Sequence, residues 1–178
     1  MPLRRRTFLV TLFGLAATAS LARAQTPFDY EATMAALKKL GAKRIVGNER
    51  NQIVTVDLGE RRVTDADLVH LAGLTELTEL DLTRTRITGA GLVHLKGLKS
   101  LRVLYLTDTK VDDAGIAHLK SLQALAFLGV SGTTITDAAF ATLKQLPKLR
   151  TLFCLGTKVT PAGIAELQRA LPEIAVTN

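Results

Sequence analysis

The sequence of 178 residues has no tryptophan, two tyrosines, six phenylalanines and a single cysteine. With Cys154 alone, no intramolecular disulfide can form, so the core must hold the fold together unaided. So few aromatic side chains argue against a protein that stacks the bases of single-stranded nucleic acid. The sequence also lacks a glycine-rich phosphate loop, zinc-type cysteine spacing and a nucleophile elbow. These absences favour a protein without a cofactor or catalytic centre.

The charge balance does not favour nucleic acid either. The formal net charge is +7, with 23 basic and 16 acidic residues. Four of the basic residues lie in residues 1–24, which contain no acidic residue, and the remainder carries 19 basic against 16 acidic residues. A surplus of this size is typical of ordinary solubility rather than of polyanion binding. We therefore expect no nucleic-acid partner.

Residues 1–24 have the composition of an export signal. Three arginines at residues 4–6 precede an uncharged run at 8–22, and an A-x-A sequence at 22–24 predicts cleavage before Gln25. The run is shorter than the roughly 20 residues of a bilayer-spanning helix, so we expect no membrane span after cleavage. Residues 5–9 resemble a twin-arginine signal, and both that route and general secretion remain open. The predicted location is the periplasm or the exterior.

A 24-residue repeat dominates the rest of the chain. The units open at Val63, Ile87, Val111, Ile135 and Val159. Within them the pattern L-x-x-L-x-L-x-x-T comprises Leu77, Leu80, Leu82 and Thr85; Leu101, Leu104, Leu106 and Thr109; Leu125, Leu128, Val130 and Thr133; and Leu149, Leu152, Cys154 and Thr157. Alternating x-L-x-L residues predict a short strand with one buried face.

The second position of each unit predicts the start of a helix. Thr64, Thr88, Asp112, Thr136 and Thr160 occupy it, and their side-chain oxygens suit a helix N-cap. Apolar pairs three residues apart follow, giving each helix one buried face. They are Leu68/Leu71, Leu92/Leu95, Ile116/Leu119 and Phe140/Leu143. Each unit therefore predicts strand, turn, short helix and turn.

These motifs resemble leucine-rich repeats, and the segments after each threonine are similar to the cysteine-containing subclass. The resemblance covers residues 53–178 and implies an α/β right-handed solenoid, with parallel strands on one face and short helices on the other. It also implies that the threonine column hydrogen-bonds the backbone after each strand. Full units are expected near 63–86, 87–110, 111–134 and 135–158, with a terminal partial unit at 159–178. Residues 25–52 are expected to form a capping helix and a hairpin.

Two side-chain groups suggest chemistry. His70, His94 and His118 share one repeat position, but helices pack about 8–10 Å apart, so three parallel imidazoles cannot converge on one ion and we expect no metal site. Asp57 and Asp81 share a position on neighbouring strands. The arginines that follow each strand offer them charge partners, so we expect a solvated surface and no catalytic residues. These arginines are Arg61, Arg62, Arg84 and Arg86.

The exposed strand positions change in character along the stack. The first strands offer Asp57, Glu79 and Asp81, whereas later ones offer Val103, Tyr105, Phe127, Phe153 and Leu155. An apolar aromatic strip beside a charged region is typical of a protein-binding surface. The sequence therefore favours a monomeric, non-catalytic binding or scaffold module of the cell envelope, with a protein or peptide partner. An architectural component that self-associates or binds glycan, and a metal-dependent or enzymatic protein exported folded, remain as alternatives.

Overall fold

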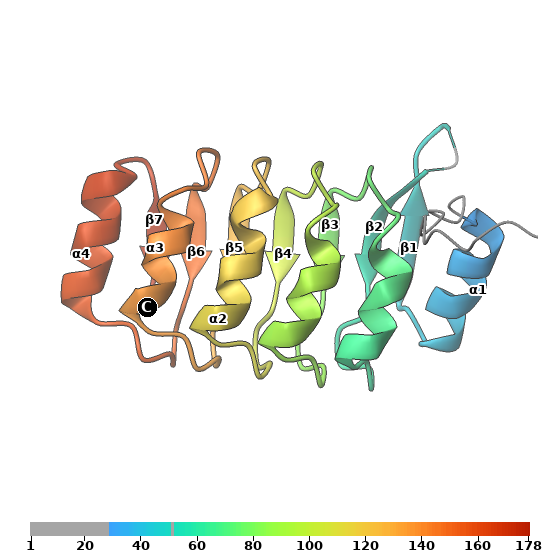
Figure 1. Ribbon diagram of the computed structural model, residues 1–178, viewed down its shortest axis with the longest axis horizontal. Helices are drawn as coiled ribbons and strands as arrows, with labels where there is room; N and C mark the ends of the chain where they lie inside the picture. The colour runs from blue at the N-terminus through green and yellow to red at the C-terminus, as the bar shows by residue number, and fades with distance from the viewer. Residues whose placement is uncertain (1–28, 51) are drawn as a thin grey trace, which may run out of the picture.

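The computed structural model describes residues 29–50 and 52–178, and the expected export signal at residues 1–24 lies outside them. The described chain forms one sheet whose strands lie in sequence order (Figure 1). The strands are β1 (Arg44–Gly47), β2 (Ile53–Asp57), β3 (Glu79–Asp81), β4 (Val103–Tyr105), β5 (Phe127–Gly129), β6 (Thr151–Phe153) and β7 (Ala175–Thr177). Strands β2 to β7 pair in parallel, as the repeat predicts, and β1 pairs antiparallel with β2.

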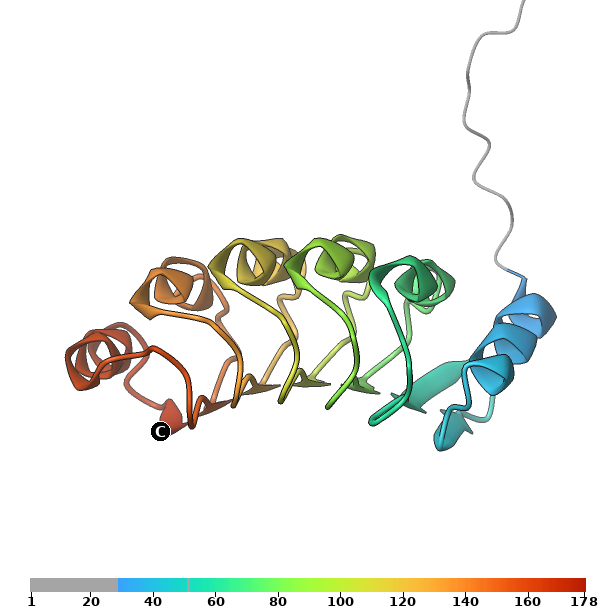
Figure 2. The same ribbon diagram turned by 90° about the horizontal axis from the view of Figure 1, so that it is seen from below.

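Helices return the chain between strands on the other face. They are α1 (Tyr30–Lys39), η1 (Asp65–Leu71), η2 (Gly89–Leu95), α2 (Asp113–Ile116), η3 (Ala117–Ser121), η4 (Asp137–Ala139), α3 (Phe140–Leu143) and α4 (Pro161–Ala170), where η denotes a 3₁₀ helix. The tighter 3₁₀ winding of η1 and η2 superposes residues i and i+3, which explains why apolar pairs at that spacing give these two helices a buried face. Figure 2 shows a curved molecule with the sheet on its inner side and the helices on its outer side.

The repeated aliphatic residues form the core. The leucines of the predicted pattern, from Leu77 to Leu152, have no exposed surface, and Cys154 is equally buried in the last unit. The predicted threonine column also hydrogen-bonds the backbone: the hydroxyl of Thr85 donates to the carbonyl oxygen of Leu82 at 2.7 Å, and Thr109 does the same to Leu106 at 2.6 Å. Each threonine thus closes the turn of its own unit rather than bridging two units.

The described chain begins with helix α1, whose N-cap Asp29 accepts a hydrogen bond from the amide of Ala32 at 2.9 Å. Leu37 of this helix is fully buried against the first repeat, and Gly41 follows the helix with a φ of 76° that favours glycine. The hairpin of β1 and β2 then leads into the parallel sheet, with Arg44 opposite Asp57.

A carboxylate ladder joins the starts of successive helices. Asp65 accepts two hydrogen bonds from Thr88 of the next unit, one from its amide at 2.7 Å and one from its hydroxyl at 2.6 Å. Asp113 binds Thr136 in the same way, with both distances 2.8 Å, and Asp137 binds Thr160 at 2.9 and 2.7 Å. The threonine hydroxyls also cap their own helices, as predicted. One carboxylate therefore fixes both the position and the cap of the following helix.

The ladder is interrupted once, between the second and third full units. Gly89 stands where the aspartate would be, and Asp112 stands where the threonine would be. The two changes belong together, because two carboxylates facing one another here would repel. Gly89 and Gly115 instead bring their backbones into close contact, and a Cβ on either would collide with the other residue.

We expect Asp113→Ala to lower the free energy of unfolding by about 1–3 kcal/mol, because it removes two hydrogen bonds to a charged acceptor and leaves the Thr136 amide unpaired. Urea unfolding followed by circular dichroism measures this loss. Glu76→Ala is the control, since Glu76 is exposed and its carboxylate makes no hydrogen bond or ion pair within residues 29–50 and 52–178. Equal stability of the two variants would contradict a stabilising ladder.

Candidate functional site

The inner face of the sheet carries two rows of side chains that no helix covers (Figure 2). The strand register aligns the first position on this face of each strand into one row and the second into another, and of these positions Thr55 and Gly129 are buried. The first row is Thr55, Glu79, Val103, Phe127 and Thr151, and the second is Asp57, Asp81, Tyr105, Gly129 and Phe153. The sequence predicted that these residues share a face, and the register brings them together.

The C-terminal half of this face holds an aromatic patch, made up of Val103, Tyr105, Phe127, Phe153 and Leu155. The ring centroids of Tyr105 and Phe127 lie 4.9 Å apart, tilted by 50°. Those of Phe127 and Phe153 lie 5.1 Å apart and nearly edge to face at 71°. Phe153 and Leu155 are 41% and 61% exposed, although both are large apolar side chains. Phe127 thus packs against both Tyr105 and Phe153, and the three rings form one continuous row of contacts.

Gly129 lies among these rings, and sequence reasoning did not assign it a role. It stands in the row between Tyr105 and Phe153, where a large side chain would compete with the rings for space. A Cβ at Gly129 would lie 3.4 Å from Cδ1 of Tyr105 and 3.5 Å from Cε1 of Phe127, so Phe127 leans from its own row over the glycine. The signal was a single glycine in a row of otherwise large or charged residues.

The N-terminal half of the face is acidic. The carboxylates of Asp57 and Asp81 each accept a hydrogen bond from the amide two residues later, at 2.9 Å from Gly59 and 2.8 Å from Thr83. These bonds orient the side chains toward the turn after each strand. Glu79 pairs with Arg44 of β1 at 3.4 Å.

Two of the arginines expected to neutralise Asp57 and Asp81 take other partners. Arg84 pairs with Glu60 at 3.5 Å and with Asp108 at 3.2 Å, and the Nε of Arg61 donates to the carbonyl oxygen of Gly41 at 2.7 Å. The expectation was wrong for Arg84, which reaches the turns of the two adjacent units, and for Arg61, which reaches the residue that follows α1.

Burial and charge together raise the pKa of Tyr105. Partial burial of the ring is the larger cause, and the negative charges of Glu79 and Asp81 add to it. The acidic half and the aromatic patch are therefore close enough to interact electrostatically at Tyr105.

Comparison with solved structures identifies the fold. An internalin (inlF) from Listeria monocytogenes matches with a TM-score of 0.60 and 23% identity, over 69% of this chain and 34% of that one. The PEPR1-AtPEP1 structure matches with a TM-score of 0.53 and 16% identity, over 82% and 24%. A leucine-rich-repeat protein from Leptospira interrogans matches with a TM-score of 0.50 and 21% identity, over 62% and 27%.

The chain is a leucine-rich-repeat solenoid. It spans about a third or less of the length of these proteins, so the likeness concerns the fold. No family model and no curated protein matches the sequence. The finer resemblance to the cysteine-containing subclass stays a prediction.

A row of alternating charges, joined by ion pairs, runs along one edge of the solenoid. Lys43 pairs with Glu60 at 3.1 Å, and Glu60 pairs in turn with Arg84, which reaches Asp108. The hydrogen bond from Lys43 is the main reason that the pKa of Glu60 is lowered. All four side chains lie at the surface, where ion pairs contribute little to stability. We regard this row of ion pairs as part of the scaffold.

The other chemical candidates lie away from the sheet face. Within residues 29–50 and 52–178, no three His, Cys, Asp or Glu side chains are grouped so that they could hold a metal ion. In the same residues no helix is both long and apolar enough to cross a membrane. Cys154 is fully buried, and burial raises the pKa of its thiol. Cys154 therefore belongs to the core rather than to a surface site.

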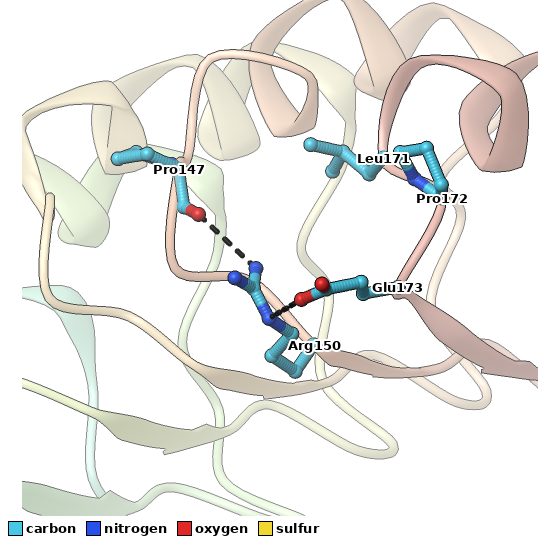
Figure 3. A pocket seen from close by; sticks show the side chains of 5 residues that line it. All are labelled: Pro147, Arg150, Leu171, Pro172 and Glu173. Atoms are coloured by element: carbon cyan, nitrogen blue, oxygen red, sulfur yellow. Dashed lines mark hydrogen bonds and ion pairs between the residues drawn. The ribbon is translucent and has the colours of Figure 1, made fainter.

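A cavity of about 280 Å³ opens near the C-terminal end, lined by Pro147, Arg150, Leu171, Pro172 and Glu173 (Figure 3). The guanidinium of Arg150 pairs with Glu173 at 2.9 Å and donates to the carbonyl oxygen of Pro147 at 3.1 Å. Since its one basic group is already neutralised and hydrogen-bonded, the cavity offers a ligand little beyond apolar contact.

We expect Asp81→Asn to lower the pKa of Tyr105, because it removes a negative charge and keeps the acceptor for the Thr83 amide. Phenolate absorbance against pH measures this, with Tyr105→Phe to distinguish its transition from that of Tyr30. The pKa of Tyr105 in the folded protein lies above the ordinary tyrosine value of about 10. The contribution of Tyr105 to folding stability is therefore fully present below about pH 10, and it is lost as the pH rises through the folded-state pKa. An unchanged Tyr105 transition in Asp81→Asn would exclude the proposed coupling.

We expect Cys154 to react with a thiol reagent only when the solenoid unfolds, because its thiol is buried and its pKa is raised. The labelling rate in the native protein should be far below that in urea, and should rise with the unfolded fraction. Rapid labelling of the folded protein would show that the last unit opens independently.

Proposed function

We propose that the protein is a non-catalytic protein-binding module whose inner sheet face holds a protein or peptide. The observation that carries this proposal is the aromatic patch, in which Phe127 contacts both Tyr105 and Phe153 while Phe153 and Leu155 remain exposed. Isolated exposed apolar residues are common, but a contiguous apolar group with a charged border is typical of an interaction surface.

The composition of the patch supports a protein partner. Tyr and Phe are enriched at the centres of protein interfaces, where they supply large buried area with few rotatable bonds. Here the strands fix the backbone of each ring and the neighbouring rings restrict its rotation, so little conformational entropy would be lost on binding. The patch is thus organised for contact before a partner arrives.

The acidic half of the face would determine the orientation in which a partner binds. Asp57 and Asp81 use one carboxylate oxygen each for a backbone amide, and their second oxygens make no hydrogen bond to the described chain. A partner with an apolar segment beside a basic side chain would bind in one orientation, with its basic group toward β2 and β3. The cell envelope is the proposed setting, on the strength of the export signal predicted for residues 1–24.

The experiment is affinity capture from the envelope fraction of the host, with three baits of residues 25–178. The wild-type bait runs beside a sheet-face variant, in which Tyr105, Phe127 and Phe153 are changed to Ala, and a helix-face variant, in which Val69 and Val93 are changed to Ala. Val69 and Val93 are 52% and 40% exposed on the outer side and serve as matched apolar controls. Thermal unfolding confirms that each bait is folded.

A partner should be retained by the wild type and the helix-face variant and lost by the sheet-face variant. Titration of that purified partner should then show affinity at least about tenfold weaker for the sheet-face variant, as expected when central aromatic contacts worth 2 kcal/mol or more are removed. Undiminished binding by the sheet-face variant would refute the proposed site.

A further inference from the structure

Three successive turns at one edge of the solenoid hold basic side chains and no acidic ones. The turns at residues 96–102, 120–126 and 144–150 connect helix ends to the next strands and hold seven basic and no acidic residues. They lie at the edge that the β1–β2 hairpin tip also reaches, at the top of Figure 1. Five of the seven make no ion pair within residues 29–50 and 52–178, and we call these five the basic edge: Lys96, Lys99, Arg102, Lys120 and Lys148.

The opposite edge differs although it has the same repeat geometry. Its turns in the same three units, 82–89, 106–113 and 130–137, mix three basic with four acidic residues. These are Arg84, Arg86 and Lys110 against Asp108, Asp112, Asp113 and Asp137. The positive charge of the basic edge is therefore a local property that the modest net charge conceals.

Helix electrostatics explain only part of the basic edge. Lys96 caps η2 and Lys120 lies in the last turn of η3, where a cation interacts favourably with the helix dipole. Lys99, Arg102 and Lys148 lie beyond the helices in the connecting turns. Lys99 donates to the carbonyl oxygen of Ser121 at 3.2 Å, whereas no hydrogen bond fixes the exposed side chains of Arg102 and Lys148 within the described chain.

We propose that the basic edge docks the solenoid on an anionic lipid surface. Its charges are spread over three consecutive units instead of converging on a cavity, and helices of adjacent units pack about 8–10 Å apart. A small anion would touch one or two of these side chains, whereas a plane of anionic headgroups contacts all five. Basic residues close to an anionic leaflet each strengthen binding, without any apolar insertion.

This contact is compatible with the sheet face and independent of it. The basic edge lies where the strands begin, so docking there leaves the inner face and its aromatic patch open to solvent (Figure 2). Because the attraction is electrostatic and the side chains are exposed, salt should weaken it strongly.

The experiment is vesicle co-sedimentation with residues 25–178, which contain every described strand and core residue. It is repeated with the full chain, in which all variants carry the same residues 1–28. Vesicles contain either phosphatidylcholine alone or phosphatidylcholine with phosphatidylglycerol. The basic-edge variant changes Lys96, Arg102, Lys120 and Lys148 to Gln. The matched control changes the same number of charges on the opposite side, at Arg62, Arg86, Lys110 and Lys158, none of which makes an ion pair in the described residues.

The wild type and the control should bind the anionic vesicles, bind neutral vesicles weakly, and dissociate as salt is raised. The basic-edge variant should bind at least about tenfold more weakly than the control, given roughly fivefold per basic residue near an anionic surface. Equal loss in both variants would show a general charge effect and overturn the proposal. Failure of the wild type to bind anionic vesicles would also overturn it.

Discussion

Main-chain hydrogen bonds between equivalent turns set the register on which every surface of this solenoid depends. The amide of Leu82 donates to the carbonyl oxygen of Tyr105 at 2.9 Å, and the same bond joins Leu106 to Gly129 at 2.7 Å. Since each unit sits one strand spacing from the next, a given repeat position forms a straight row of side chains. The chemistry of a face is then decided by what one position of the repeat contains in successive units. A core of identical leucines and a surface of changing residues can therefore coexist in one repeat.

That constraint explains why a single glycine matters in two places. At Gly129 the rings of Tyr105 and Phe127 lie within van der Waals contact of the place a Cβ would take, so a larger side chain there would have to displace them. At Gly89 it replaces a carboxylate of the inter-unit ladder, and Asp112 in the next unit replaces the hydroxyl that such a carboxylate would bind. In both cases a residue of the neighbouring unit is compatible with the glycine. The reason for each glycine is therefore found in a pair of adjacent units and not in a single repeat.

The repeat period made the fold and the membership of the sheet face predictable from the sequence. Alternation along each strand placed Tyr105 and Phe153 opposite the buried leucines, and the register then aligned them. Side-chain partners were less predictable, because they depend on which of several nearby turns a long side chain reaches. Arg84 thus pairs along the edge with Glu60 and Asp108, where its sequence neighbours had suggested Asp81. The use of Asp65 and its equivalents as ties between units was missed for the same reason.

The net charge of the chain does not predict the charge of each of its edges. A surplus of three basic residues beyond residue 24 argues against a general polyanion binder, and that argument holds for the molecule as a whole. Charges more than about a Debye length from a bound surface are screened, however, so that surface interacts mainly with the charges of the edge it touches. On the edge where helices end, seven basic residues lie in three turns without an acidic one, while on the other edge the carboxylates needed to tie and cap the helices offset the arginines and lysines. The demand for acidic residues at helix starts therefore polarises the solenoid, and five of the seven basic residues where the helices end make no ion pair within the described residues.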